Sequence, residues 1–225
     1  MVKINRKNTA IYPEQPHLIL CEGVDAYYFL MWLLDDVKQQ QPKFAEFWLY
    51  NFKGITQLTE YLSNLSKMDG FSENVKSICV IRDAETAASG ACQSIKTSLQ
   101  ACGFAVPDKP CIKADGSGDY PQIATGFALF PTISESPENG TLEDLCLRIL
   151  AKADAEELLG QADKVLEPHK EQLARLHKNR LHTYFSLTDD FVSLKIGEAS
   201  KCKAFDYGAP DILSLKSFLL QMTGA

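Results

Sequence analysis

The first 110 residues alternate short, almost wholly apolar segments with segments of helical periodicity, and this alternation limits the fold more than any other feature. The strand-like segments read HLILCE, EFWLYNF and SICVIRD, at residues 17–22, 46–52 and 77–83. Each is followed by a helix-like segment, at residues 25–38, 53–68 and 87–103. Strands joined by crossover helices pair in parallel, and strands that are apolar throughout are buried on both faces. We therefore predict an α/β fold with a mainly parallel central sheet flanked by helices on both faces.

The pattern is looser after residue 115, and helices dominate the last third of the chain. CIKA and TGFALFP have strand character, at residues 111–114 and 125–131. A helix is predicted to start at Thr141, with Asp144 at the capping-box position, and to run through residue 153. Further helical segments are predicted at 154–187 and 212–222. We expect an α/β core over residues 1–152 and a helical region, 153–225, that packs on it within a single compact domain.

Composition restricts the compartment and the partners. No apolar run reaches the roughly 18 residues that a membrane span needs. The basic segment at residues 1–12 has no apolar core behind it, so we interpret it as a surface arm, not as a secretory signal. Seven cysteines, an odd number without CxxC spacing, indicate reduced thiols. We therefore expect a cytoplasmic protein without a membrane partner.

Acidic side chains end two of the predicted strands. Glu22 ends the first strand, Asp83 ends the third, and Glu85 follows two residues later. In open parallel sheets, ligands bind at the carboxyl ends of the strands. Carboxylates that meet in a partly buried cleft repel one another, and a divalent cation removes that repulsion. A ligand set made only of oxygens favours Mg²⁺ or Mn²⁺. Gly23 would let the chain turn sharply or let a phosphate approach the backbone.

Each of these residues also has a simpler interpretation. Glu22 could be a solvated strand end, and Asp25 could be the N-cap of the following helix. Arg82 could pair with one of the acids, although neighbours along a strand point to opposite faces. Lys113 precedes the loop ADGSGD, where it could hold a phosphate at the mouth of the cleft or remain a solvated surface lysine.

Charge is distributed unevenly along the chain. The net charge of −6 argues against nucleic-acid binding through a general basic surface. Basic residues nevertheless cluster in the last third of the chain: Lys164, Lys170, Arg175, Lys178 and Arg180. Acids are interspersed among them, so a solvated helix face with ion pairs three and four residues apart is the first interpretation. The alternative is a track for a nucleic-acid backbone.

The order of these acidic motifs resembles a known family. A strand that ends in Glu-Gly, followed by a later apolar strand that ends in D-x-D, resembles the Toprim domain of topoisomerases, primases and OLD-type nucleases. Here the second motif is Asp83-Ala84-Glu85, so its last acid is longer by one methylene. The chain more closely resembles small stand-alone bacterial Toprim-like proteins catalogued only as a domain of unknown function. That likeness rests on LILCEGVDAYYFL, ICVIRDAE, LQACGF, the G-x-LED element at 140–144 and an apolar helix after a G-A-P turn.

The resemblance implies a Toprim fold and a metal site, and it supplies no substrate. In OLD-type relatives, acids after the D-x-D motif help to complete the site, which makes Glu143 the candidate here and Asp144 the alternative. Together with the residues above, this predicts a metal-dependent, nuclease-like hydrolysis of phosphodiesters in DNA or RNA. The chain has no P-loop and no tyrosine obviously placed as a topoisomerase nucleophile. The alternative function is a non-catalytic module that binds a metal, a nucleotide or a partner, and a separately encoded ATPase is a candidate partner.

Overall fold

The structure, a computed structural model, describes residues 15–41 and 47–224 and contains a four-stranded parallel sheet with the order β2-β1-β3-β4. The strands are β1 (His17–Cys21), β2 (Phe47–Asn51), β3 (Ser77–Asp83) and β4 (Ala124–Phe130). This confirms the predicted α/β fold with a parallel sheet and is consistent with a Toprim-like fold. The predicted surface arm at residues 1–12 and the start of the strand predicted at 46–52 lie outside the described residues.

Helices follow each strand and make up the C-terminal part of the chain. The first group is α1 (Val24–Gln40), α2 (Leu58–Ser66), α3 (Phe71–Asn74) and α4 (Ala88–Ala101), with a 3-10 turn η1 (Ile55–Gln57) before α2. The second group is α5 (Leu142–Arg148), α6 (Ala155–Leu166), α7 (Leu176–Ser186), α8 (Ile196–Lys201) and α9 (Pro210–Thr223), with a 3-10 turn η2 (Glu167–Gln172) after α6.

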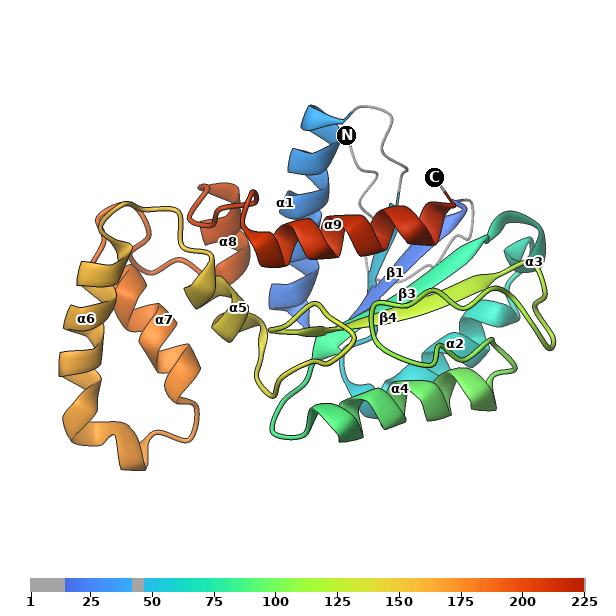
Figure 1. Ribbon diagram of the computed structural model, residues 1–225, viewed down its shortest axis with the longest axis horizontal. Coiled ribbons are helices and arrows are strands. Elements are labelled where there is room, and N and C mark those ends of the chain that lie inside the picture. Colours follow the sequence, from blue (N-terminus) through green and yellow to red (C-terminus); the bar gives the residue numbers. More distant parts are fainter. Residues whose placement is uncertain (1–14, 42–46, 225) are drawn as a thin grey trace.

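Strand side chains alternate between two hydrophobic cores, one on each face of the sheet. Leu20 and Val80 belong to the core that α2 and α4 cover. Cys21 and Ile81 belong to the core that α1 and α9 cover. Figure 1 shows α9 lying across one face of the sheet and α2 and α4 beneath the other. Burial on both faces explains why the strands are apolar without alternation.

The C-terminal helix docks closely on β4, as predicted for the apolar segment at 212–222. Gly126 faces α9, and a Cβ at this position would lie 2.5 Å from Sδ of Met222 and 2.9 Å from Cζ of Phe218. The absence of a side chain at Gly126 therefore allows the helix to approach the sheet.

The helical region predicted at 154–187 is a hairpin of α6 and α7 joined through η2, which contains Pro168. The hairpin lies beside α5, away from the sheet (Figure 1). Two of its basic residues are paired within it: Arg180 with Asp163 at 2.6 Å, and Lys170 with Glu167. These pairs favour the interpretation of a solvated face over that of a nucleic-acid track.

Two predicted elements differ in the structure. Residues 111–114 do not form a strand; they run antiparallel to β4, with an isolated bridge between Ala114 and Thr125. The helix that starts after Thr141 ends at Arg148 and not at residue 153. Its end is set by tertiary pairing, because the backbone around Leu150 forms an antiparallel bridge to Phe205.

Among the described residues, no helix combines the length and apolar character that crossing a membrane requires. The seven cysteines lie within the described ranges and are unpaired thiols, of which Cys21, Cys79 and Cys146 are buried.

Candidate active site at the carboxyl edge of the sheet

The strand order makes the region between the carboxyl ends of β1 and β3, which we call the crevice, a topological switch point. After β1 the chain enters α1 on one face of the sheet, and after β3 it enters α4 on the opposite face. The two connections therefore diverge, and such a topological switch point is where open parallel sheets bind ligands. Glu22 follows β1 and Asp83 ends β3, so both predicted acids flank this crevice.

Glu22 forms an ion pair with Arg82. Cys21 is in register with Ile81, so the next residue of each strand projects from the same face of the sheet. Oε2 of Glu22 lies 2.8 Å from Nε of Arg82, and these side chains are 22% and 8% exposed. Neither atom has a hydrogen bond within the described residues, so this contact is an ion pair without aligned hydrogen-bond geometry. The other carboxylate oxygen, Oε1, accepts a hydrogen bond from the backbone N–H of Ile55 at 3.0 Å.

Gly23 turns the chain directly after Glu22. Its φ of +89° lies in the region that glycine favours, and no described atom lies within 4 Å of the position a Cβ would take. The buried Oδ1 of Asn51 accepts hydrogen bonds from the backbone N–H groups of Gly23, at 3.0 Å, and Lys53, at 2.7 Å. Asn51 thus fastens the loops after β1 and β2 to each other, a role that sequence reasoning missed.

The predicted N-cap at Asp25 is wrong. Helix α1 begins at Val24 with Gly23 at the N-cap, and Asp25 lies within the first turn. A carboxylate in that turn still interacts favourably with the positive end of the helix dipole.

Asp83 points to the face of the sheet opposite to Arg82 and is half-buried. Its Oδ1 accepts a hydrogen bond from the backbone N–H of Leu142 at 2.8 Å. Burial, with a smaller contribution from the negative charges of Glu143, Glu85 and Glu22, raises the pKa of Asp83 to about 7 against the lowering effect of that hydrogen bond. Within the described part of the chain, no basic side chain forms an ion pair with Asp83.

Glu143 lies in the first turn of α5 and is 4% exposed. Its Oε1 lies 2.9 Å from Nζ of Lys178, which reaches it from α7. Burial raises the pKa of Glu143, but hydrogen bonds from Lys178 and Thr141 outweigh burial and leave that pKa below its usual value. The alternative ligand, Asp144, is occupied in the predicted capping box, where it accepts a hydrogen bond from the backbone N–H of Thr141 at 2.8 Å.

Glu85 is exposed and has a left-handed backbone, with φ of +56°. Its backbone N–H donates to the carbonyl oxygen of Gly140 at 2.8 Å, and the N–H of Gly140 donates to the carbonyl of Glu85 at 2.8 Å. These two bonds hold the loop before α5 against the end of β3. They thereby bring Glu143 to Asp83, although 60 residues separate them in the sequence.

The structure does not bring Lys113 to this crevice, contrary to the expectation. Its neighbour Ala114 pairs with Thr125 near the amino end of β4, whereas Asp83 pairs with Phe130 at the carboxyl end. Five residues of strand separate these positions, or about 16 Å. Lys113 instead pairs with Asp115 at 3.0 Å.

The acids of the crevice match a magnesium ion in donor type but not in their present positions. Asp83 is a half-buried carboxylate whose neighbours are other carboxylates, which is the arrangement that a hard cation stabilises. Within residues 15–41 and 47–224, however, no three histidine, cysteine or acidic side chains are placed to hold one metal ion. Glu22 and Glu143 are each paired with a basic side chain, Arg82 and Lys178 respectively, and Glu22 and Asp83 point to opposite faces of the sheet.

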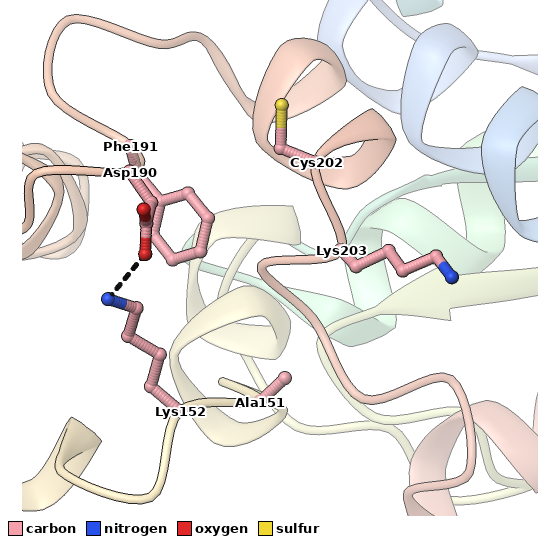
Figure 2. A pocket seen from close by; sticks show the side chains of 6 residues that line it. All are labelled: Ala151, Lys152, Asp190, Phe191, Cys202 and Lys203. Carbon is pink, nitrogen blue, oxygen red and sulfur yellow. Dashed lines mark ion pairs between the residues drawn. The ribbon is translucent and has the colours of Figure 1, made fainter.

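A second hollow, of about 570 Å³, lies between the end of α5 and the end of α8. Its lining includes Lys152, Asp190, Phe191 and Lys203. Lys152 and Asp190 form an ion pair at 2.7 Å, and Figure 2 shows Lys203 directed away from that pair. Because its charged groups do not converge, this hollow is a weaker candidate than the crevice.

Fold and crevice together define an α/β protein with an acidic cluster at the switch point of a parallel sheet. The chain belongs to the family described as "Protein of unknown function (DUF3226)", whose model matches residues 16–224. The match spans the sheet, the crevice and the helices through α9. Comparisons with curated proteins and with solved structures found no match.

Proposed function

We propose that the crevice binds Mg²⁺ or Mn²⁺ and that the protein hydrolyses phosphodiesters of DNA or RNA. The observation that carries this proposal is the environment of Asp83. It is a half-buried carboxylate without a basic partner among the described residues, and the charges of three other carboxylates raise its pKa. A bound divalent cation would offset both the repulsion and the cost of burial.

Asp83 would be the central metal ligand, and Glu143, Glu85 and Glu22 are the further carboxylates whose charges act on it. When bound, a divalent cation neutralises phosphate charge and polarises the phosphodiester. The open space in front of the Gly23 backbone gives a substrate phosphate room to approach. The resemblance of the Glu22-Gly23 and Asp83-Ala84-Glu85 motifs to Toprim domains adds support.

The proposal is tested by replacing Asp83 with asparagine, which preserves shape and removes the charge. We expect Asp83→Asn to weaken Mn²⁺ binding by about 10–100-fold and to abolish metal-dependent cleavage of labelled DNA or RNA. Electron paramagnetic resonance, which measures free hexaaqua Mn²⁺, gives the affinity. The matched control is Asp69→Asn, since this exposed residue lies before α3 at the opposite end of the sheet. Equal Mn²⁺ affinity in both variants would contradict the proposal.

A second candidate function is a non-catalytic module that binds metal, nucleotide or a partner. The observation that favours it is the ion pairing of Glu22 with Arg82 and of Glu143 with Lys178, which already neutralises two of the four acids. Mn²⁺ binding that is lost in Asp83→Asn, without cleavage of DNA, RNA or nucleotides, would select this function. The separately encoded ATPase remains a predicted partner.

A further inference from the structure

We propose that Arg82 and Lys53 form a phosphate-binding site beside Glu22, on the face of the sheet that α2 and α4 cover. The ligand is a phosphate group of the substrate, and its binding requires no metal ion. The inference rests on the proposed function only for the choice of a phosphodiester as substrate, and it adds the residues that hold this substrate.

The guanidinium group of Arg82 has donors to spare. The Arg82 side chain is 8% exposed, and its Nε lies 2.8 Å from Oε2 of Glu22. Among the described residues, no group accepts a hydrogen bond from its terminal nitrogens, Nη1 and Nη2. Nε is the guanidinium atom that is enclosed without a hydrogen bond, so Nη1 and Nη2 keep access to the surface. Two parallel hydrogen bonds from this end of the guanidinium match two oxygens of a phosphate.

Glu22 orients Arg82 but does not satisfy it. Oε1 of Glu22 accepts a hydrogen bond from the backbone N–H of Ile55 at 3.0 Å, which ties the carboxylate to the start of η1. Oε2 faces Arg82 without aligned hydrogen-bond geometry. A buried guanidinium held in this way keeps much of its desolvation cost, and a phosphate that accepts from Nη1 and Nη2 would offset that cost.

Lys53 supplies a second cation from the loop just before η1. Its backbone N–H and that of Gly23 both donate to Oδ1 of Asn51, at 2.7 Å and 3.0 Å, which fixes Lys53 beside the carboxyl end of β1. Lys53 is exposed and forms no ion pair with the described residues. Its φ of +70° is unfavourable for a lysine, and such backbone conformations concentrate at functional sites. Lys53 therefore takes the place at the crevice that the sequence gave to Lys113.

The experiment measures binding of a fluorescein-labelled, ten-residue oligothymidylate to the full chain by fluorescence anisotropy, in EDTA so that no metal contributes. We expect Lys53→Gln to weaken binding about tenfold and to lower the slope of log Kd against log salt concentration by about 1, because one phosphate contact is lost. Lys53→Arg should retain the affinity. The matched control is Lys67→Gln, which should change neither quantity, since this exposed lysine is the C-cap of α2, at the far end of the helix.

A second set of measurements tests the guanidinium and identifies the ligand. Arg82→Lys keeps a charge beside Glu22 but loses the paired donors, so it should also weaken binding about tenfold. The same oligonucleotide with uncharged methylphosphonate linkages should not bind. Competition by inorganic phosphate or by thymidine 5′-monophosphate, compared with unlabelled oligothymidylate, shows whether a free phosphate, a nucleotide or a strand is preferred, and each of these results upholds a phosphate site.

The inference and the proposed function fail in different ways. If wild-type protein does not bind the charged oligonucleotide, or if Lys53→Gln and Lys67→Gln bind it equally well, the phosphate site is wrong, and the Mn²⁺ measurement on Asp83→Asn still decides the metal site. If the protein binds no Mn²⁺ but binds oligothymidylate through Lys53, the metal-dependent hydrolysis is wrong and the phosphate site stands. Should Arg82→Lys fail to fold by circular dichroism, the Lys53 variants decide the matter.

Discussion

Asp83 and Glu143 are neighbouring acids whose surroundings drive their pKa values in opposite directions. Burial raises the pKa of Asp83 to about 7, and no basic side chain of the described residues compensates. Glu143 is more deeply buried, but hydrogen bonds from Lys178 and Thr141 hold its pKa below the usual value. Neighbouring carboxyl groups with separated pKa values divide acid and base roles. The pKa of Asp83 therefore lies closer to neutral pH than that of Glu143.

This difference predicts how stability depends on pH. Between its ordinary pKa of 3.8 and about 7, Asp83 binds more proton in the folded than in the unfolded protein. Protonated Asp83 therefore contributes to the stability of the folded protein at low pH, and this contribution is lost as pH rises through about 7. Relative to Asp83→Asn, the free energy of unfolding of the metal-free protein should fall by a few kcal/mol, to order of magnitude, between about pH 4.5 and about pH 8. Urea unfolding with EDTA at both pH values measures it, and identical pH slopes would contradict the raised pKa.

The individual acids could be selected from the sequence, but their partners could not. Glu22, Asp83 and Glu85 stand out because a charged side chain at the end of a buried strand is costly unless it is paired or binds a ligand. The pairing of Glu22 with Arg82 follows from the register between β1 and β3, which is known only once the two strands are known to be neighbours. Lys113 was considered as a phosphate ligand because it precedes the loop ADGSGD, but its segment runs antiparallel beside β4 and holds it away from the carboxyl edge.

At the level of elements, the α6–α7 hairpin is connected to the crevice through one ion pair. Lys178 of α7 reaches the buried carboxylate of Glu143 in α5. Sequence patterning treated Lys178 as one of several solvated cations, because helical spacing cannot show which face of a helix meets another element. Pro168 does signal a break between α6 and α7 in the sequence. The early end of α5 has no comparable signal, since it depends on pairing with the distant segment around Phe205.

Breaking this ion pair should destabilise the protein in a pH-dependent way. In Lys178→Gln the buried Glu143 loses its main partner, and we expect a loss of roughly 1–3 kcal/mol at neutral pH, reduced by the partial exposure of Lys178. The pKa of Glu143 is lowered in the folded protein, so this stability is present above its ordinary value of 4.5 and is lost as pH falls below it. Guanidinium unfolding at neutral and acid pH measures the difference.

The control for this prediction is Lys164→Gln, an exposed lysine of the same hairpin without an ion pair among the described contacts. Its replacement should change stability by less than about 0.5 kcal/mol. A loss in Lys178→Gln that is the same at neutral and at acid pH would show that packing of the lysine stem, and not charge, is responsible.

At the scale of the whole molecule, the alternation of strands and helices was enough to predict a parallel sheet covered on both faces. It was not enough to predict the order β2-β1-β3-β4, because apolar strands of similar length can exchange places without any change in periodicity. That order places the switch point between β1 and β3, and so decides that Glu22 and Asp83 share a crevice. The sequence thus selects the acids, and the topology places Glu22 and Asp83 at neighbouring strand ends, on opposite faces of the sheet.

The packing of α9 on the sheet can be tested by adding one methyl group at Gly126. A Cβ at Gly126 would lie 2.5 Å from Sδ of Met222 and 2.9 Å from Cζ of Phe218, so in Gly126→Ala these side chains, or α9 with them, must shift. We expect Gly126→Ala to lower the free energy of unfolding by about 1–3 kcal/mol.

Gly160→Ala is the matched control, because Gly160 lies inside α6 and no described atom lies within 4 Å of its Cβ position. There alanine should stabilise by about 0.5–1 kcal/mol through its helix propensity. Thermal unfolding distinguishes the two, and a Gly126→Ala protein as stable as wild type would mean that α9 does not press on the sheet as described.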